Sequence, residues 1–221
     1  MSLACKAPYV GSIPTAASKG SGRNSPGTWG EIRWLFAAST STGNYGQQLY
    51  LCRRVRPVAP TLSPEVRLAE AGLRLPDPLP AFGQYLPAVH HGEQLWVGGH
   101  FGTHPDGSIS VGRCGGGVSV AEARDAARSA ALNLLATVRH ALGSLEPVVR
   151  VTQVLGVVNA TPDFTEHTAV IDAASDVFVE AFGDAGRHTR LAVGVSSLPG
   201  NLVLEVQAHL IVSPADPSDH P

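Results

Sequence analysis

Two residues near the end of the chain carry opposite charges within otherwise apolar segments. The stretch 186–212, GRHTRLAVGVSSLPGNLVLEVQAHLIV, has Arg190 at the start of one apolar run and Glu205 in the middle of the next. An arginine guanidinium binds a carboxylate through two parallel hydrogen bonds, and a nearby carboxylate can orient or activate water. The pair therefore indicates hydrolysis of a carboxylate-bearing small molecule; the plainer alternative is a surface ion pair between strands.

The strand pattern determines whether these two side chains can meet. A turn centred on Leu198 and Pro199 predicts an antiparallel hairpin. In such a hairpin the residue numbers of two directly opposite residues add up to about 397. Arg190 and Glu205 would then be diagonal neighbours on one face of the sheet. A shift of one residue in this register would place them on opposite faces instead.

Alternating helix and strand patterns precede this stretch. Residues 119–143 predict a helix with a capping box at Ser119 and Glu122 and a C-terminal glycine, Gly143. The other expected elements are helices at 63–75 and 166–183, strands at 84–92, 93–102 and 147–159, and a short third strand at 107–112. This order predicts an α+β fold, with one mixed sheet and two helices packed on one face. Because the last strand carries apolar residues on both faces, we expect association through the sheet.

Composition narrows the possible partners. The 221 residues are 43 % hydrophobic and 15 % charged, with a formal net charge of −2. Nucleic-acid-binding proteins normally carry an excess of clustered basic residues, which this net charge does not indicate. We therefore expect no nucleic-acid partner. No apolar run reaches the length of a membrane span and no secretory signal is recognisable, so we expect a cytoplasmic protein without a membrane partner.

Cysteine and histidine side chains are the candidate metal ligands in this sequence. Three cysteines without a paired spacing predict neither a disulfide framework nor a zinc site. His90 and His91 would point to opposite faces of a strand, so at most one of them could join His100. We therefore expect no metal site, and we expect Cys114 to be an inert thiol.

The chain divides by composition into three parts. Residues 1–63 are rich in Ser, Gly and Thr, which predicts a disordered extension. An alternative is that this part is not native coding sequence and that translation starts at Val55 or Val58. We expect residues 64–213 to form the orderly domain and residues 214–221 to form a flexible tail.

Several motifs within the orderly domain resemble the RidA/YjgF family of reactive-intermediate deaminases, in a longer branch. They are GQYLPAV, QLWVGGHFG, the capped helix, VTQVLGVVN, VFVEAFG, HTRLAVGV and SLPGNLVLEVQAHL, together covering about residues 66–212. The resemblance implies a chorismate-mutase-like fold and a homotrimer with sites between subunits. It also implies hydrolysis of enamines and imines such as 2-aminoacrylate to 2-keto acids and ammonia, without metal or cofactor.

The resemblance assigns roles to individual residues. Arg190 corresponds to the carboxylate-binding arginine, Glu205 to the glutamate that positions water, and Tyr85 to a tyrosine that lines the cleft. Further matched positions depart from the family pattern in residue type and are expected to contact substrate: Gly98, His100, Ser175 or Asp176, and Ala192.

These departures leave two functions open. One is the imine deaminase, and the other is a non-catalytic trimer of the same family that binds small carboxylates. The endoribonuclease activity attributed to some relatives is disfavoured by the acidic balance.

Overall fold

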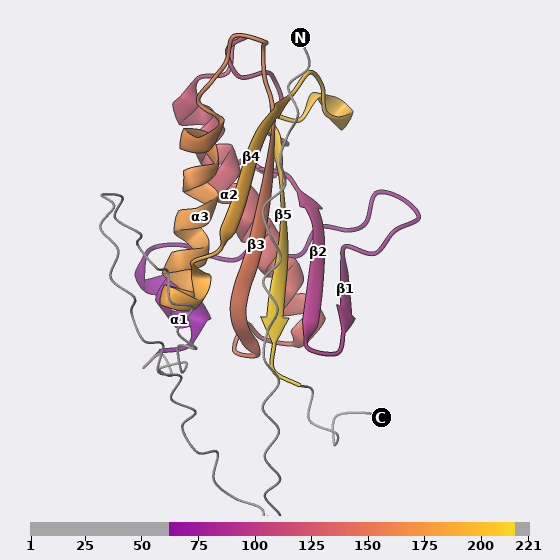
Figure 1. Cartoon of the computed structure of the whole chain (residues 1–221), viewed down its shortest axis with the longest axis vertical. Coiled ribbons are helices and arrows are strands. Elements are labelled where there is room, and N and C mark those ends of the chain that lie inside the picture. The colour runs from indigo at the N-terminus through magenta and orange to yellow at the C-terminus, as the bar shows by residue number, and fades with distance from the viewer. Residues whose placement is uncertain (1–61, 215–221) are drawn as a thin grey trace, which may run out of the picture. The chain divides into compact units, whose positions relative to one another are not determined.

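A computed structural model describes residues 62–214 (Figure 1). The predictions for residues 1–61 and for 215–221, including the alternative translation starts, lie outside the described residues. The elements in chain order are α1 (Pro64–Glu70), β1 (Ala88–His91), β2 (Gln94–His100), α2 (Val120–Leu142), β3 (Val148–Asn159), α3 (His167–Phe182), the 3₁₀ turn η1 (Gly183–Gly186), β4 (Thr189–Val195), the 3₁₀ turn η2 (Pro199–Asn201) and β5 (Leu204–Val212).

The long helix α2 begins and ends where its sequence predicts. The Ser119 hydroxyl accepts from the Glu122 amide, and the Glu122 carboxylate accepts from the Ser119 amide at 2.8 Å, which completes the capping box. At the other end, Gly143 has a φ of 82°, a conformation that strains any residue with a side chain.

The strands form a single mixed sheet in the order β1-β2-β5-β3-β4. Only β3 and β4 run parallel; the other neighbours are antiparallel. Helices α2 and α3 lie side by side against one face (Figure 1). The α+β prediction, with one mixed sheet and two covering helices, is therefore confirmed.

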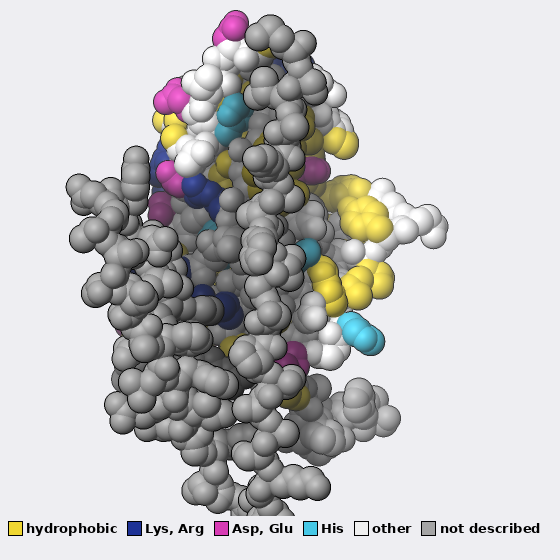
Figure 2. Space-filling model, in the orientation of Figure 1, with side chains coloured by type: hydrophobic (Ala, Val, Ile, Leu, Met, Phe, Trp, Pro, Cys, Tyr) yellow, Lys and Arg dark blue, Asp and Glu magenta, His cyan; other side chains and the backbone are white. Residues whose placement is uncertain are grey.

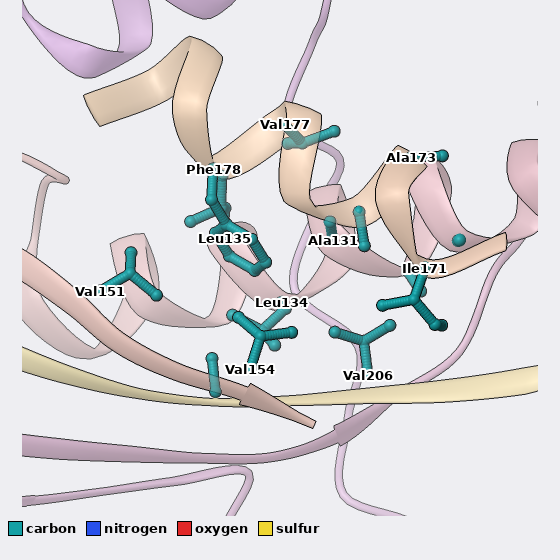
Figure 3. Packing of buried hydrophobic residues seen from close by; sticks show 14 of the residues in the cluster. Ala131, Leu134, Leu135, Val151, Val154, Ile171, Ala173, Val177, Phe178 and Val206 are labelled. Atoms are coloured by element: carbon teal, nitrogen blue, oxygen red, sulfur yellow. The ribbon is translucent and has the colours of Figure 1, made fainter. Parts of the chain in front are cut away.

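The core fills the space between the two helices and the sheet. Helix residues Leu134, Leu135 and Phe178 meet strand residues Val154 and Val206, and all five are fully buried (Figure 3). Burial alternates strictly along β5, so every second side chain faces the helices and the rest face outward. The outward face remains partly apolar; Leu191 on it is 53 % exposed.

The predicted hairpin of the last two strands is wrong. The strand β4 pairs with β3 in parallel, and β5 pairs with β3 from its other side. The connection from Val195 to Leu204 therefore crosses the end of β3 instead of turning back on its own strand. Gly200 and Asn201, with φ of 60° and 57°, bend the chain within this crossing.

The predicted third strand at 107–112 is also wrong. It makes only isolated bridges, from Ile109 to Thr103 and from Val111 to Leu202. The β1–β2 hairpin is confirmed, with its turn at Gly92 and with Ala88 opposite Val97.

Candidate functional site

An apolar groove opens beside β2 and the start of β5. Its volume is about 520 Å³. The residues that line it are Phe82, Tyr85, Gly99, Phe101, Ile109, Val111, Pro199, Gly200, Leu202 and Glu205. Figure 2 shows hydrophobic side chains gathered beside β1 and β2. Glu205 is the one charged group in this lining, so the groove joins an apolar surface to a single carboxyl group.

Backbone geometry on β2 makes room for that carboxyl group. The register with β5 shifts between Val97 and His100, a β-bulge that contains Gly98 and Gly99. A Cβ atom added at Gly99 would lie 3.2 Å from Glu205 Oε2, so the absent side chain leaves space for the carboxyl group. Glu205 is half-buried, and desolvation by burial raises the pKa of its carboxyl group.

A polar cluster lies on the other face of the sheet, between α3 and β4. Arg190 pairs with the core residue Val154, so its side chain points toward the helices. Its guanidinium Nη1 lies 2.7 Å from Asp172 Oδ1 and donates to Ser175 Oγ at 2.9 Å. The arginine side chain is 20 % exposed, so the guanidinium sits in a partly desolvated position at the edge of the sheet.

His188 extends this cluster. Its Nε2 lies 3.1 Å from Ser175 Oγ, and its Nδ1 lies 2.6 Å from the carbonyl oxygen of Gly186. The ring meets Phe178 edge-on, with the centroids 5.6 Å apart. Burial first, and the charge of Arg190 in addition, lower the pKa of His188, whereas its bond to the Gly186 carbonyl raises it.

Sequence reasoning missed both Asp172 and His188. The alternation of the strand was a usable signal for His188, because residues two apart on a strand share a face and Arg190 is two residues on. The helical repeat was a signal for Asp172, because residues three apart on a helix are neighbours and Ser175 is three residues on.

The two residues expected to act together are not together in one chain. Glu205 pairs with Val157 on the outward face, whereas Arg190 faces the helices. The predicted diagonal contact between Arg190 and Glu205 is therefore wrong, because it depended on a hairpin that does not form. Of the two positions predicted on the second helix, Ser175 contacts Arg190, whereas Asp176 lies 3.9 Å from Arg124 and is 69 % exposed.

The remaining predicted residues are divided between the two faces. Tyr85 lines the groove, and its hydroxyl accepts from the Phe82 amide at 3.3 Å. Ala192 lies on the Arg190 face and packs against the core. The His100 imidazole is only 4 % exposed and bonds to Thr137 of α2 at 2.7 Å, so the ring points away from the groove.

The described residues offer no metal cluster and no reactive thiol. Between residues 62 and 214, no group of three His, Cys, Asp or Glu side chains could hold a metal ion. Cys114 is fully buried, and its burial raises the pKa of the thiol, so it lacks the environment of a reactive cysteine. No helix in this part of the chain combines the length and apolar character needed to cross a bilayer.

The described residues thus form a small α+β domain with helices on one face of the sheet, a polar cluster between α3 and β4, and an apolar groove beside β2. The chain belongs to the family described as "YjgF/chorismate_mutase-like, putative endoribonuclease", whose model matches residues 65–210. This is the RidA/YjgF family that the motifs indicated.

Individual relatives agree with the family match. Protein TCP17 of Trypanosoma cruzi is 37 % identical over 142 residues, covering 64 % of this chain and 89 % of that protein. The crystal structure of Atu1372, a protein of unknown function from Agrobacterium tumefaciens, is 38 % identical with a TM-score of 0.62, covering 68 % of this chain and 94 % of that one. The structure of "a putative endoribonuclease" from Shewanella oneidensis is 34 % identical with a TM-score of 0.65, covering 68 % of this chain and all of that one.

Proposed function

We propose that the protein hydrolyses 2-imino acids and their enamine tautomers to 2-keto acids and ammonia, in a cleft that two subunits complete. The observation that carries this proposal is the division of the site. Arg190 and Ser175 lie on the helix face beside β4, whereas Glu205 and Tyr85 lie in the groove beside β2.

The Arg190 cluster and the Glu205 groove lie toward opposite edges of one sheet. The strand β4 is one edge of the sheet, and the groove borders β2, next to the other edge strand β1. A head-to-tail interface joins unlike surfaces of neighbouring subunits, and it closes into a ring when the rotation between subunits allows it. Such an interface would bring Arg190 of one subunit to Glu205 of the next. The homotrimer is the assembly that the family resemblance implies, and the partly apolar outward face offers it a surface.

The chemistry then follows from the residues. Arg190 holds the substrate carboxylate, and Glu205 positions water for attack on the imine carbon. A raised pKa suits Glu205 for accepting a proton from water and returning it to the departing nitrogen as the tetrahedral adduct breaks. The products are a 2-keto acid and ammonia, so one water is consumed for each C=N bond that is broken. The apolar and aromatic lining, including Tyr85, would receive the substrate side chain.

A direct test uses an imine made in situ by a serine or threonine dehydratase, followed by measurement of keto-acid formation. We expect the Arg190→Ala and Glu205→Ala variants to lose activity. Equal rates for wild type and Arg190→Ala would reject the enzymatic proposal. Binding of 2-ketobutyrate without turnover would favour the alternative, a small-carboxylate-binding protein.

Subunit complementation tests the shared cleft. Each variant alone has no intact site, but every mixed trimer would have one intact site out of its three. Since about three quarters of randomly assembled trimers are mixed, co-expression should restore about a quarter of wild-type activity. A mixture no more active than either variant alone would show that both groups act within one subunit or not at all.

A further inference from the structure

The polar cluster between α3 and β4 has a proton arrangement that the hydrogen-bond partners determine. A carbonyl oxygen can only accept, so the Gly186 carbonyl requires a proton on Nδ1 of His188. A neutral imidazole protonated at Nδ1 has a bare Nε2, which accepts from the Ser175 hydroxyl at 3.1 Å. Arg190 can only donate, so its Nη1 donates to the same serine oxygen at 2.9 Å.

This arrangement matches that of an activated nucleophile. Such a hydroxyl lies within hydrogen-bond reach of a base, and a further group orients the base. Here the Gly186 carbonyl and the edge of Phe178 hold the ring of His188. The lowered pKa of His188 leaves its ring neutral at pH 7, so Nε2 is free to take a proton. The Arg190 cation beside Ser175 Oγ favours a developing negative charge there.

The cluster is also accessible. Ser175 and His188 are half-buried, and Asp172, which contacts the same guanidinium, is 48 % exposed. The hydroxyl therefore lies at the junction of a helix and an edge strand, outside the apolar groove that contains Glu205.

We propose that Ser175 is a nucleophile with His188 as its general base, and that the protein hydrolyses small, short-chain acyl esters through an acyl-serine intermediate. This activity is separate from imine hydrolysis, although both would use Arg190. Within one subunit, Ser175 and His188 lie outside the groove that contains Glu205, and ester hydrolysis does not require Glu205.

The reaction has two balanced halves. Ser175 Oγ attacks the ester carbonyl carbon while its proton passes to His188 Nε2, and the carbonyl oxygen takes the negative charge next to Arg190. The carbon–oxygen bond to the alcohol then breaks, and the alcohol leaves with the proton from His188. Water attacks the acyl-serine, giving its proton to His188, and the acid departs as Ser175 Oγ regains that proton. The sum is ester plus water giving acid plus alcohol.

A fluorophosphonate probe tests whether Ser175 is a nucleophile, with peptide mass spectrometry locating the adduct. We expect labelling of Ser175 in the full chain, none in Ser175→Ala, and labelling slowed at least about 100-fold in His188→Gln, since a general base contributes about 10²- to 10⁴-fold. Ser197→Ala, which changes an exposed serine on the β4–β5 connection, is the matched control and should label like wild type. Labelling is read on the protein itself, so this proposal and imine hydrolysis can fail separately.

Hydrolysis of p-nitrophenyl acetate provides the second readout. The rate should fall about 100-fold or more in Ser175→Ala and in His188→Gln, with melting temperatures close to that of the Ser197→Ala control. Two results would each overturn the proposal. One is an unmodified Ser175 under conditions that fully label a known serine esterase; the other is ester hydrolysis that persists at the wild-type rate in Ser175→Ala. Either result would mean that the cluster only ties α3 to β4.

Discussion

If Arg190 binds a substrate carboxylate as proposed, Asp172 competes for the same guanidinium, and removing its charge should strengthen binding of a carboxylate ligand. The Asp172 Oδ1 atom lies 2.7 Å from the guanidinium Nη1 of Arg190, the position that a ligand carboxylate would approach. Two unit charges 4 Å apart interact by about 4 kcal/mol at an effective dielectric constant of 20. Because the Asp172 side chain is 48 % exposed, solvent screens much of this energy, and about 1 kcal/mol is a fair expectation. Asp172→Asn should thus bind 2-ketobutyrate about fivefold more tightly.

Isothermal titration calorimetry with 2-ketobutyrate measures this change. Asp176→Asn is the matched control, because it removes the same charge from α3 at a residue paired with Arg124 instead of Arg190. The gain for Asp172→Asn should shrink as salt is added, since screening weakens the competing pair. Unchanged or weaker binding by Asp172→Asn would refute the reasoning and would mean that Asp172 holds Arg190 in its binding position.

Three further predictions concern groups placed by the fold. Burial lowers the pKa of His100, so the unfolded chain binds more protons there and stability should fall as the pH drops below about 6.5. His100→Gln should flatten this part of the plot of unfolding free energy against pH, measured by chemical denaturation. An unchanged slope would mean that His100 does not cause the pH dependence. Burial raises the pKa of Glu205, so its ionisation costs stability as the pH rises through the folded-state value. Glu205→Gln should have a higher melting temperature than wild type at pH 8 and the same melting temperature at pH 4. Equal melting temperatures at both pH values would contradict a raised pKa for Glu205. A Cβ atom at Gly156 would overlap the buried Ile171 side chain. Gly156→Ala should therefore lower the free energy of unfolding by about 1–3 kcal/mol, as measured by chemical denaturation. A neutral effect would show that α3 shifts freely.

Local sequence signals predicted the elements far better than their pairing. The capping box of α2 and the β-branched run of β3 are local features, and both elements formed at the predicted places. The predicted pairing of β4 with β5 was wrong because no local sequence feature indicates that β5 lies between β2 and β3. One signal was available: the connection from Val195 to Leu204 is longer than most hairpin loops.

The candidate site was predictable in its residue types and not in its arrangement. Arg190 and Glu205 could be singled out from the sequence because they are charged residues within apolar strands. Whether they shared a face depended on a register that alternation alone cannot supply. His188 and Asp172 required the helix and the edge strand to be placed side by side, which only the tertiary structure provides.

The position of β5 also has a consequence for synthesis of the protein. The strand β5 follows the other four strands of the sheet along the chain, and it makes both central pairings, to β2 and to β3. Before Leu204–Val212 emerge, β1–β2 and β3–β4 are two separate pairs of strands with no ladder between them. Two-stranded pieces are marginal in water, so this domain should stay open until β5 has emerged. Chains that stall before Leu204 would expose two unpaired edges, which makes them substrates for chaperones and proteases instead of partly working copies.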